Sequence, residues 1–131
     1  MKILTHLIVG VLFVIFMVAI GTQRVMAQDP VKLAPKNHKV LLENDQVRVL
    51  EFHGKPGEKL AMHSHPANVL YTFSASKAKY TFPDGKTTED EIKAGQATWR
   101  EPVTHAWENV GKTEAHSLII ELKGPAKKST K

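Results

Sequence analysis

From residue 37 onward, apolar residues recur with a period of two, and this alternation is the strongest constraint on the fold. The clearest runs are 46–53, 68–75 and 116–122. A period of two places successive side chains on opposite faces of a β-strand, whereas an amphipathic helix repeats every 3.6 residues. Turn residues separate the runs at 54–57, at Asp84 and Gly85, at Gly95 and at Gly111. The sequence therefore predicts about eight short strands and an all-β sandwich or barrel.

The same alternation predicts local details. Asp84 and Gly85 lie between two alternating runs and predict a hairpin, because both residue types tolerate a positive φ. Residues 86–95 carry an acidic run without an apolar stripe, so we expect an exposed strand or loop there. In the first run Val47, Val49 and Phe52 alternate with Arg48 and Glu51. Val69, Tyr71 and Phe73 alternate with their neighbours in the second run, and His116, Leu118, Ile120 and Leu122 share one face in the third.

The first 27 residues differ in composition from the rest. Lys2 precedes an almost wholly apolar stretch, and Val25-Met26-Ala27 supplies a small-residue cleavage site before Gln28. This order is typical of a secretory signal peptide, and a retained membrane anchor is the alternative. We expect a signal peptide at 1–27, an extended arm at 28–37, a β-barrel domain at 38–123 and a Lys-rich disordered tail at 124–131. The mature protein is then periplasmic or secreted and no longer attached to a membrane.

Composition excludes several classes of function. The chain has no cysteine, which rules out disulfides, a thiolate nucleophile, Cys-ligated zinc and iron–sulfur clusters. Its net charge of +5 arises from the N-terminal segment and from Lys127, Lys128 and Lys131, while the body is balanced. A nucleic-acid-binding protein needs basic residues clustered on its folded surface, and no such cluster is visible. We therefore expect no nucleic-acid partner.

Histidines are the residues that most clearly indicate chemistry. His63 and His65 lie two apart in a strand, so their imidazoles share one face and can present two nitrogen ligands to one metal ion. His105 lies on a later strand, with Trp107 and Asn109 on its face. A lone histidine is usually a hydrogen-bonded or exposed residue, and this is the interpretation favoured for His53. The three together favour a metal site.

At these residues the chain resembles a known family. Gly57 followed by His63 and His65 matches the first half of the cupin signature. Gly95, Pro102, His105 and Asn109 resemble the second half, and the resemblance covers roughly residues 40–123. The chain is thus similar to a single-domain small cupin, which implies a jelly-roll barrel with an open mouth. Arg100 and Glu101 would then flank this mouth.

Two departures from the family pattern concern the metal. Cupins usually place a Glu after the two histidines, where this chain has Val69 and Leu70, or Asn68 when aligned on the strand. The second signature also lacks its usual Gly, with Val103-Thr104 between Pro102 and His105. An amide oxygen is a neutral and weaker ligand than a carboxylate. The resemblance implies one divalent transition metal (Fe, Zn, Mn, Ni or Cu) held by His63, His65, His105 and Asn68 or water.

The resemblance implies two functions between which the sequence does not choose. One is a metal-dependent enzyme, a dioxygenase or isomerase acting on a small organic molecule, for which no catalytic residue can be named. The other is a non-catalytic module of the cell envelope that binds metal or ligand. In both cases the pocket wall is expected to include Tyr71, Phe73, Trp107 and His116, although His116 is as readily a core residue. We also predict a homodimer, with residues 28–45 covering an exposed sheet edge.

Overall fold

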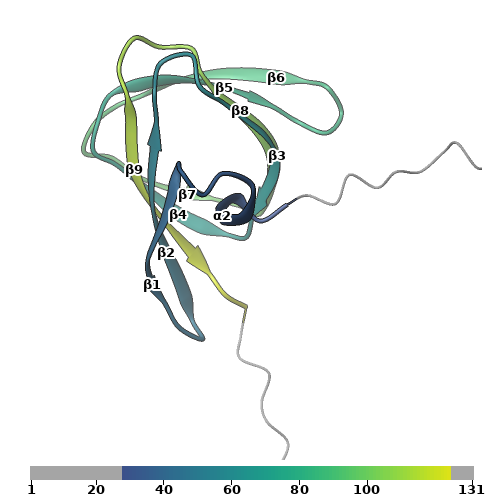
Figure 1. The fold of residues 1–131 in the computed structure, drawn as a ribbon, viewed down its shortest axis with the longest axis vertical. Coiled ribbons are helices and arrows are strands. Elements are labelled where there is room, and N and C mark those ends of the chain that lie inside the picture. Colours follow the sequence, from purple (N-terminus) through teal and green to yellow (C-terminus); the bar gives the residue numbers. More distant parts are fainter. Residues whose placement is uncertain (1–27, 125–131) are drawn as a thin grey trace, which may run out of the picture.

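The computed structural model describes residues 28–124, which form two antiparallel sheets closed against each other as a jelly-roll barrel (Figure 1). The predicted signal peptide and residues 125–131 of the predicted tail lie outside the described residues. The five-stranded sheet has the order β1 (His38–Glu43), β2 (Val47–Gly54), β9 (Ala115–Leu122), β4 (Asn68–Thr72) and β7 (Ala97–Arg100). The four-stranded sheet has the order β3 (Lys59–His65), β8 (Val103–Asn109), β5 (Ser76–Thr81) and β6 (Thr87–Ile92). The all-β prediction is confirmed.

The segment predicted as an extended arm contains one helical turn, α2 (Pro30–Leu33). Asp29 caps it, because its side chain accepts a hydrogen bond from the backbone N–H of Val31 at 3.0 Å. Upstream of the turn, Gln28 forms a parallel bridge with His63, and β1 pairs with β2. Gln28 and β1 therefore pair within their own chain, and β1 forms one edge of the five-stranded sheet. Within residues 28–124, no helix is long and apolar enough to cross a bilayer.

The hairpin and the acidic strand form where the sequence predicts them. β5 and β6 pair antiparallel from Ser76 and Ile92 to Thr81 and Thr87, around a turn that contains Asp84 and Gly85. Gly85 has φ of 83°, and no described non-glycine residue has a positive φ, so Asp84 does not adopt the predicted conformation. β6 is exposed along its length, as expected for a strand without an apolar face.

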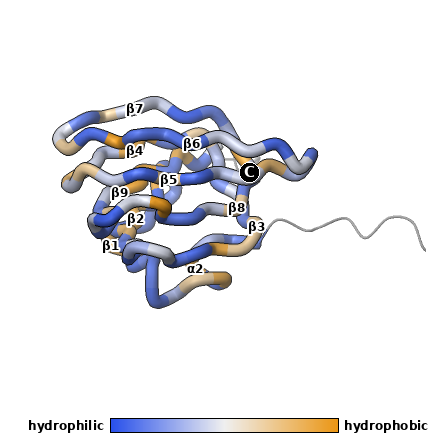
Figure 2. Tube along the Cα trace, turned by 90° about the horizontal axis from the view of Figure 1, so that it is seen from above, coloured by the Kyte–Doolittle hydropathy of each residue, from blue (hydrophilic) through white to orange (hydrophobic). Residues whose placement is uncertain are grey.

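The faces of the five-stranded sheet differ from the prediction. Leu50 and Phe52 are buried inside the barrel, with Arg48 on the same face, whereas Val47 and Val49 face outward. The barrel interior holds polar groups, so the face of β2 with Arg48, Leu50 and Phe52 points inward, and the face with Val47, Val49, Glu51 and His53 points outward. The outward side chains make a continuous row across all five strands, which we call the outer row: Leu42, Val49, Ile120, Val69 and Trp99. Figure 2 shows polar and apolar residues alternating along the strands.

One end of the barrel is filled by aromatic side chains from β2 and β8. The Phe52 and Trp107 rings meet edge to face, with centroids 5.0 Å apart. Trp107 covers Gly54 so closely that a Cβ there would lie 2.2 Å from the indole. Asn109 closes this end by donating from its Nδ2 to the carbonyl oxygens of Gly54 and Thr113, each at 2.9 Å. This packing leaves the other end of the β8 face, at His105, facing the cavity.

Candidate metal centre

Three buried histidines converge inside the barrel. His63 and His65 share the inner face of β3, and His105 is the cross-strand partner of His63 on β8. Their ring centroids are 4.8 to 5.7 Å apart, and one nitrogen of each ring lies within 4.8 Å of the others. Their exposed fractions are 2% to 6%. The predicted grouping of these three residues is confirmed, and we call it the triad.

A β-bulge in β3 determines the orientation of the His63 side chain. The pairing of β3 with β8 shifts between Leu60 and His63, so β3 contains one residue more than its partner over this stretch. The carbonyl oxygen of Ala61 in the bulge accepts a hydrogen bond from His63 Nδ1 at 2.7 Å. Because a neutral imidazole carries one N–H, the lone pair of His63 is then on Nε2. This is the form that binds a metal ion.

His65 is oriented by a buried carboxylate that sequence reasoning did not single out. His65 Nδ1 donates to Glu121 Oε1 at 2.7 Å, and Arg48 Nε donates to Glu121 Oε2 at 2.6 Å. Arg48 also donates to Asp29 Oδ2 at 2.9 Å. Burial alone would raise the pKa of Glu121, but the hydrogen bonds from His65 and Arg48 bring it below its ordinary value. We call Asp29, Arg48, Glu121 and His65 the buried relay.

In the sequence, the only indication of the buried relay is that polar residues share one face of the last strand, β9. Ser117, Ile119 and Glu121 share a face, and a charged residue among buried positions needs a partner. Arg48 is directly opposite Glu121 in the pairing of β2 with β9. That pairing joins residues more than seventy positions apart, so the sequence alone could not identify it.

A fourth histidine borders the same cavity. His38 is 4% exposed, and its ring centroid lies 6.2 Å from that of His63 and 6.3 Å from that of His65. Burial lowers the pKa of His38 to about 4. Burial, with the charges of His63, His65 and Arg100, lowers the pKa of His105 to about 3. His105 and the neighbouring His38 are therefore neutral at neutral pH, which favours metal binding at His105 because a proton does not compete there.

The cavity beside the triad, together with the open solvent at its mouth, has a volume of about 620 Å³. Its walls are mainly apolar and include Phe52, Leu60, Trp107 and Ile119. Arg100 is the cationic residue of the lining: its Nη2 donates to Tyr80 Oη at 3.3 Å, and its buried Nε has no partner among the described residues. An unpaired buried N–H beside imidazoles provides a donor for an oxygen atom of a ligand.

The structure separates the residues predicted for the pocket wall. Trp107 is buried and lines the cavity. Tyr71 and Phe73 are 36% and 46% exposed, and their rings contact each other outside the barrel wall. His116 borders the cavity, but its ring contacts Phe73 and His53. The inward residues of β4 are instead Asn68, Leu70 and Thr72.

Asn68, the predicted fourth ligand, is buried and borders the cavity with the triad. Its Nδ2 donates to the carbonyl oxygen of Pro66 at 2.8 Å. This hydrogen bond fixes the amide and leaves Oδ1 as the atom that can accept a hydrogen bond or bind a cation.

Acid should destabilise the metal-free protein. The unfolded chain binds protons at histidine below about pH 6.5, whereas folded His38 and His105 stay neutral, so stability falls as the pH drops through this range. At pH 5 each of these two histidines lowers the free energy of unfolding by about 2 kcal/mol. We expect denaturant titration in a chelator to show a lower free energy of unfolding at pH 5 than at pH 7.5, with His38→Gln reducing the difference. Equal stability at both pH values would contradict this assignment.

Comparison with solved structures identifies the fold. A cupin domain from Bordetella pertussis aligns with a TM-score of 0.61 and 26% identity, covering 66% of this chain and 92% of that chain. A conserved protein with a double-stranded β-helix domain from Klebsiella pneumoniae aligns with a TM-score of 0.54 and 27% identity, covering 69% and 78%.

A cupin-like protein from Thermotoga maritima shows the same fold, with a TM-score of 0.52, 23% identity and coverage of 69% of this chain and 72% of that chain. No protein-family profile and no curated protein matches the sequence. The strand order, the position of the triad on β3 and β8 and the structural likenesses agree with the resemblance found in the sequence. Residues 28–124 form a small domain of the cupin superfamily.

Proposed function

We propose that the triad binds one divalent transition-metal ion and that the adjoining cavity holds a small organic anion beside it. The observation that carries this proposal is the convergence of three buried imidazoles, two of which have their tautomers set by Ala61 and Glu121. The predicted signal peptide at 1–27 supports placing this function in the periplasm or outside the cell.

The residues present fit such an ion. Three neutral nitrogen ligands suit Fe, Zn, Mn, Ni or Cu, and Asn68 Oδ1 or water can complete the shell. Glu121 is not in the triad, but its negative charge lies one hydrogen bond behind His65. A carboxylate in this position raises the basicity of the imidazole and holds its ring in place. It thus supplies part of the charge that the usual glutamate ligand would provide.

The bound ion would supply Lewis acidity toward an oxygen atom of the ligand. Arg100 would bind a second, anionic oxygen, because its Nε is buried and free of other described partners. His38 Nδ1 donates to the carbonyl oxygen of Ala34 at 3.3 Å, so its Nε2 is the atom that can accept a proton from the ligand. The apolar walls at Phe52 and Trp107 exclude water from this space.

This arrangement supports a metal-dependent dioxygenase or isomerase of small oxygenated acids. A binding module without turnover is the second candidate, and the observation that favours it is the neutral Asn68 at the place of the family's usual glutamate. Turnover of enolisable or phenolic carboxylates, or oxygen consumption with them, by the metal-loaded protein would decide for the enzyme. Tight binding without turnover would decide for the module.

Removing two triad ligands should abolish metal binding in the cavity. We expect His63→Ala/His65→Ala to lose one equivalent of metal relative to the wild type, measured by mass spectrometry after dialysis. Glu121→Gln should keep the ligands but weaken binding about 10- to 100-fold, because it removes the charge that supports His65. Glu101→Gln is the matched control, since Glu101 is exposed and accepts from Trp99. Unchanged metal content in the double variant would refute the site.

Arg100 should determine the preference for anions. We expect metal-loaded protein to bind small carboxylic acids more tightly than the corresponding amides in calorimetric titrations. Arg100→Gln should weaken carboxylate binding about 10- to 100-fold, the range for a lost hydrogen bond to a charged group, and leave amide binding unchanged. Equal affinity for acids and amides in the wild type would exclude an anionic ligand.

We also propose that the protein is a homodimer formed through the outer row. Trp99 and Leu42, at the two ends of this row, are 53% and 49% exposed, and a two-fold axis through its centre would place the row of one copy on that of the other. Light scattering should give twice the chain mass for the wild type and the single mass for Trp99→Glu. A monomeric wild type would contradict the proposal.

A further inference from the structure

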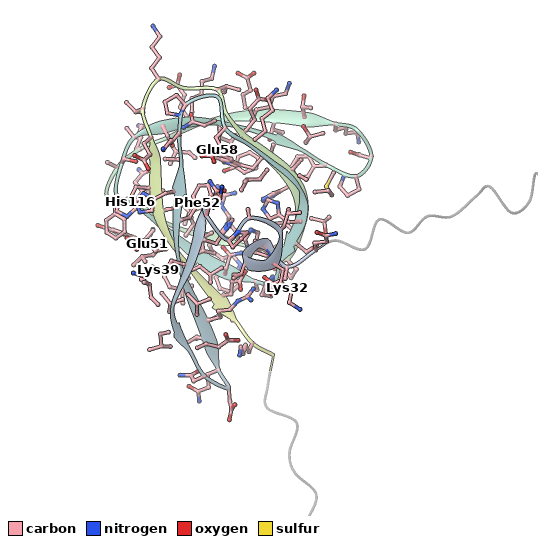
Figure 3. All side chains as sticks on the ribbon, in the orientation of Figure 1. Lys32, Lys39, Glu51, Phe52, Glu58 and His116 are labelled. Carbon is pink, nitrogen blue, oxygen red and sulfur yellow. The ribbon has the colours of Figure 1, made fainter. Side chains whose placement is uncertain are left out.

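A second group of histidine and glutamate side chains lies on the outer side of β2 and β9. Glu51 and His53 come from β2 and His116 from β9, and their ligand atoms lie within 4.8 Å of one another. Figure 3 shows Glu51 and His116 next to each other at this outer side. The triad faces the inside of the barrel wall, and the two groups share no ligand, although His116 also borders the cavity.

The register of the sheet builds this group. His53 and His116 are direct cross-strand partners, and Glu51 lies two residues before His53 on the same face. The two imidazole rings are stacked, with centroids 4.1 Å apart and planes 17° apart. The Phe73 ring packs against the His116 ring, with their centroids 4.6 Å apart. The ligand atoms are therefore held by two strands and one aromatic neighbour, not by a mobile loop.

The hydrogen bonds of the described residues leave the Nε2 atom of His53 without a donor. His53 Nδ1 lies 3.1 Å from Glu114 Oε1, to which it donates, so the lone pair of a neutral His53 is on Nε2. The Nε2 atom of His53 lies 3.6 Å from Glu51 Oε1, which also carries lone pairs. His116 Nε2 lies 3.0 Å from the same oxygen and donates to it in the Nε2–H tautomer, so only Nε2 of His53 faces this oxygen with a lone pair. A nitrogen lone pair facing a carboxylate oxygen is repulsive unless a cation or a proton lies between them.

The distances match the spacing of ligands around one small cation. In a tetrahedral zinc shell with bonds of about 2.0 Å, neighbouring ligand atoms are about 3.3 Å apart. The two contacts of Glu51 Oε1, at 3.0 Å and 3.6 Å, lie on either side of this value. Glu114 provides the carboxylate that commonly orients a metal-bound histidine from its other nitrogen.

We propose that Glu51, His53 and His116 form a second divalent transition-metal site, with Glu114 positioning His53 and a coordination position left open. Two imidazoles and one carboxylate are a ligand set that suits Zn²⁺, and the open position accepts water or a ligand atom from another molecule. The site ties the ends of β2 and β9 together on the outside. It is independent of the function proposed for the triad.

The experiment uses Zn²⁺ as the probe and removes the triad first. In His63→Ala/His65→Ala we expect one equivalent of Zn²⁺ to remain in calorimetric titration. Adding His53→Ala should remove it, with affinity falling at least about 100-fold, and adding Glu114→Gln should weaken it about 10- to 100-fold. Glu89→Gln is the matched control. Glu89 lies on the exposed strand β6 and pairs with Lys77 of β5, so this substitution should leave zinc binding unchanged. Zinc binding that survives His53→Ala would overturn the proposal.

A second measurement does not depend on the triad variant folding. In the wild-type protein, Co²⁺ should broaden the ring resonances of His53 and His116 as well as those of the triad. In His53→Ala the broadening at His116 should be lost while that of the triad remains. Broadening confined to the triad, or a total of one zinc equivalent in the wild type, would overturn the proposal without affecting the triad assignment.

Discussion

The buried relay is the interaction on which the rest of the structure depends. Asp29, Arg48, Glu121 and His65 come from the capped turn, β2, β9 and β3, and their contacts are 2.6 to 2.9 Å long. Removing one partner of a buried charge pair costs about 3–5 kcal/mol, because the other charge is left without compensation. The relay therefore joins both sheets and the N-terminal turn, and the same contacts orient a histidine of the triad.

A polar interior has consequences for the whole barrel. The inner face of the five-stranded sheet carries Arg48, Asn68 and Glu121 beside the apolar Leu50, Phe52 and Ile119, and further apolar residues lie on its outer face. The hydrophobic core includes Leu50, Phe52, Leu60, Trp107 and Ile119, so it shares the barrel interior with these polar groups. The apolar wall also makes the cavity poor in water, which strengthens the interactions of Arg100 and the imidazoles. The same distribution thus explains the exposed outer row and the shielded metal centre.

The sequence predicted the strands and the triad because both depend on local rules. Residues two apart on a strand share a face, which is enough to group His63 with His65, and the second signature supplied His105. The sequence did not predict the inward face of β2, because Val47 and Val49 are more apolar than Arg48. Arg48 shares its face with the buried Leu50 and Phe52, and its pairing with Glu121 compensates its charge on that face. His116 was assigned to an apolar face for the same reason, and that face is on the outside.

The two histidine groups depend on one register. β9 carries Glu121 on its inner face and His116 on its outer face, and β2 carries Arg48 inside and His53 outside. A slip of one residue between these strands would exchange the faces, placing His116 in the cavity and leaving Arg48 without its carboxylate. The buried ion pair makes such a slip costly. The Arg48–Glu121 contact that fixes the triad therefore also fixes the cross-strand pair of His53 and His116, because the strand pair is rigid and its two faces cannot be set independently.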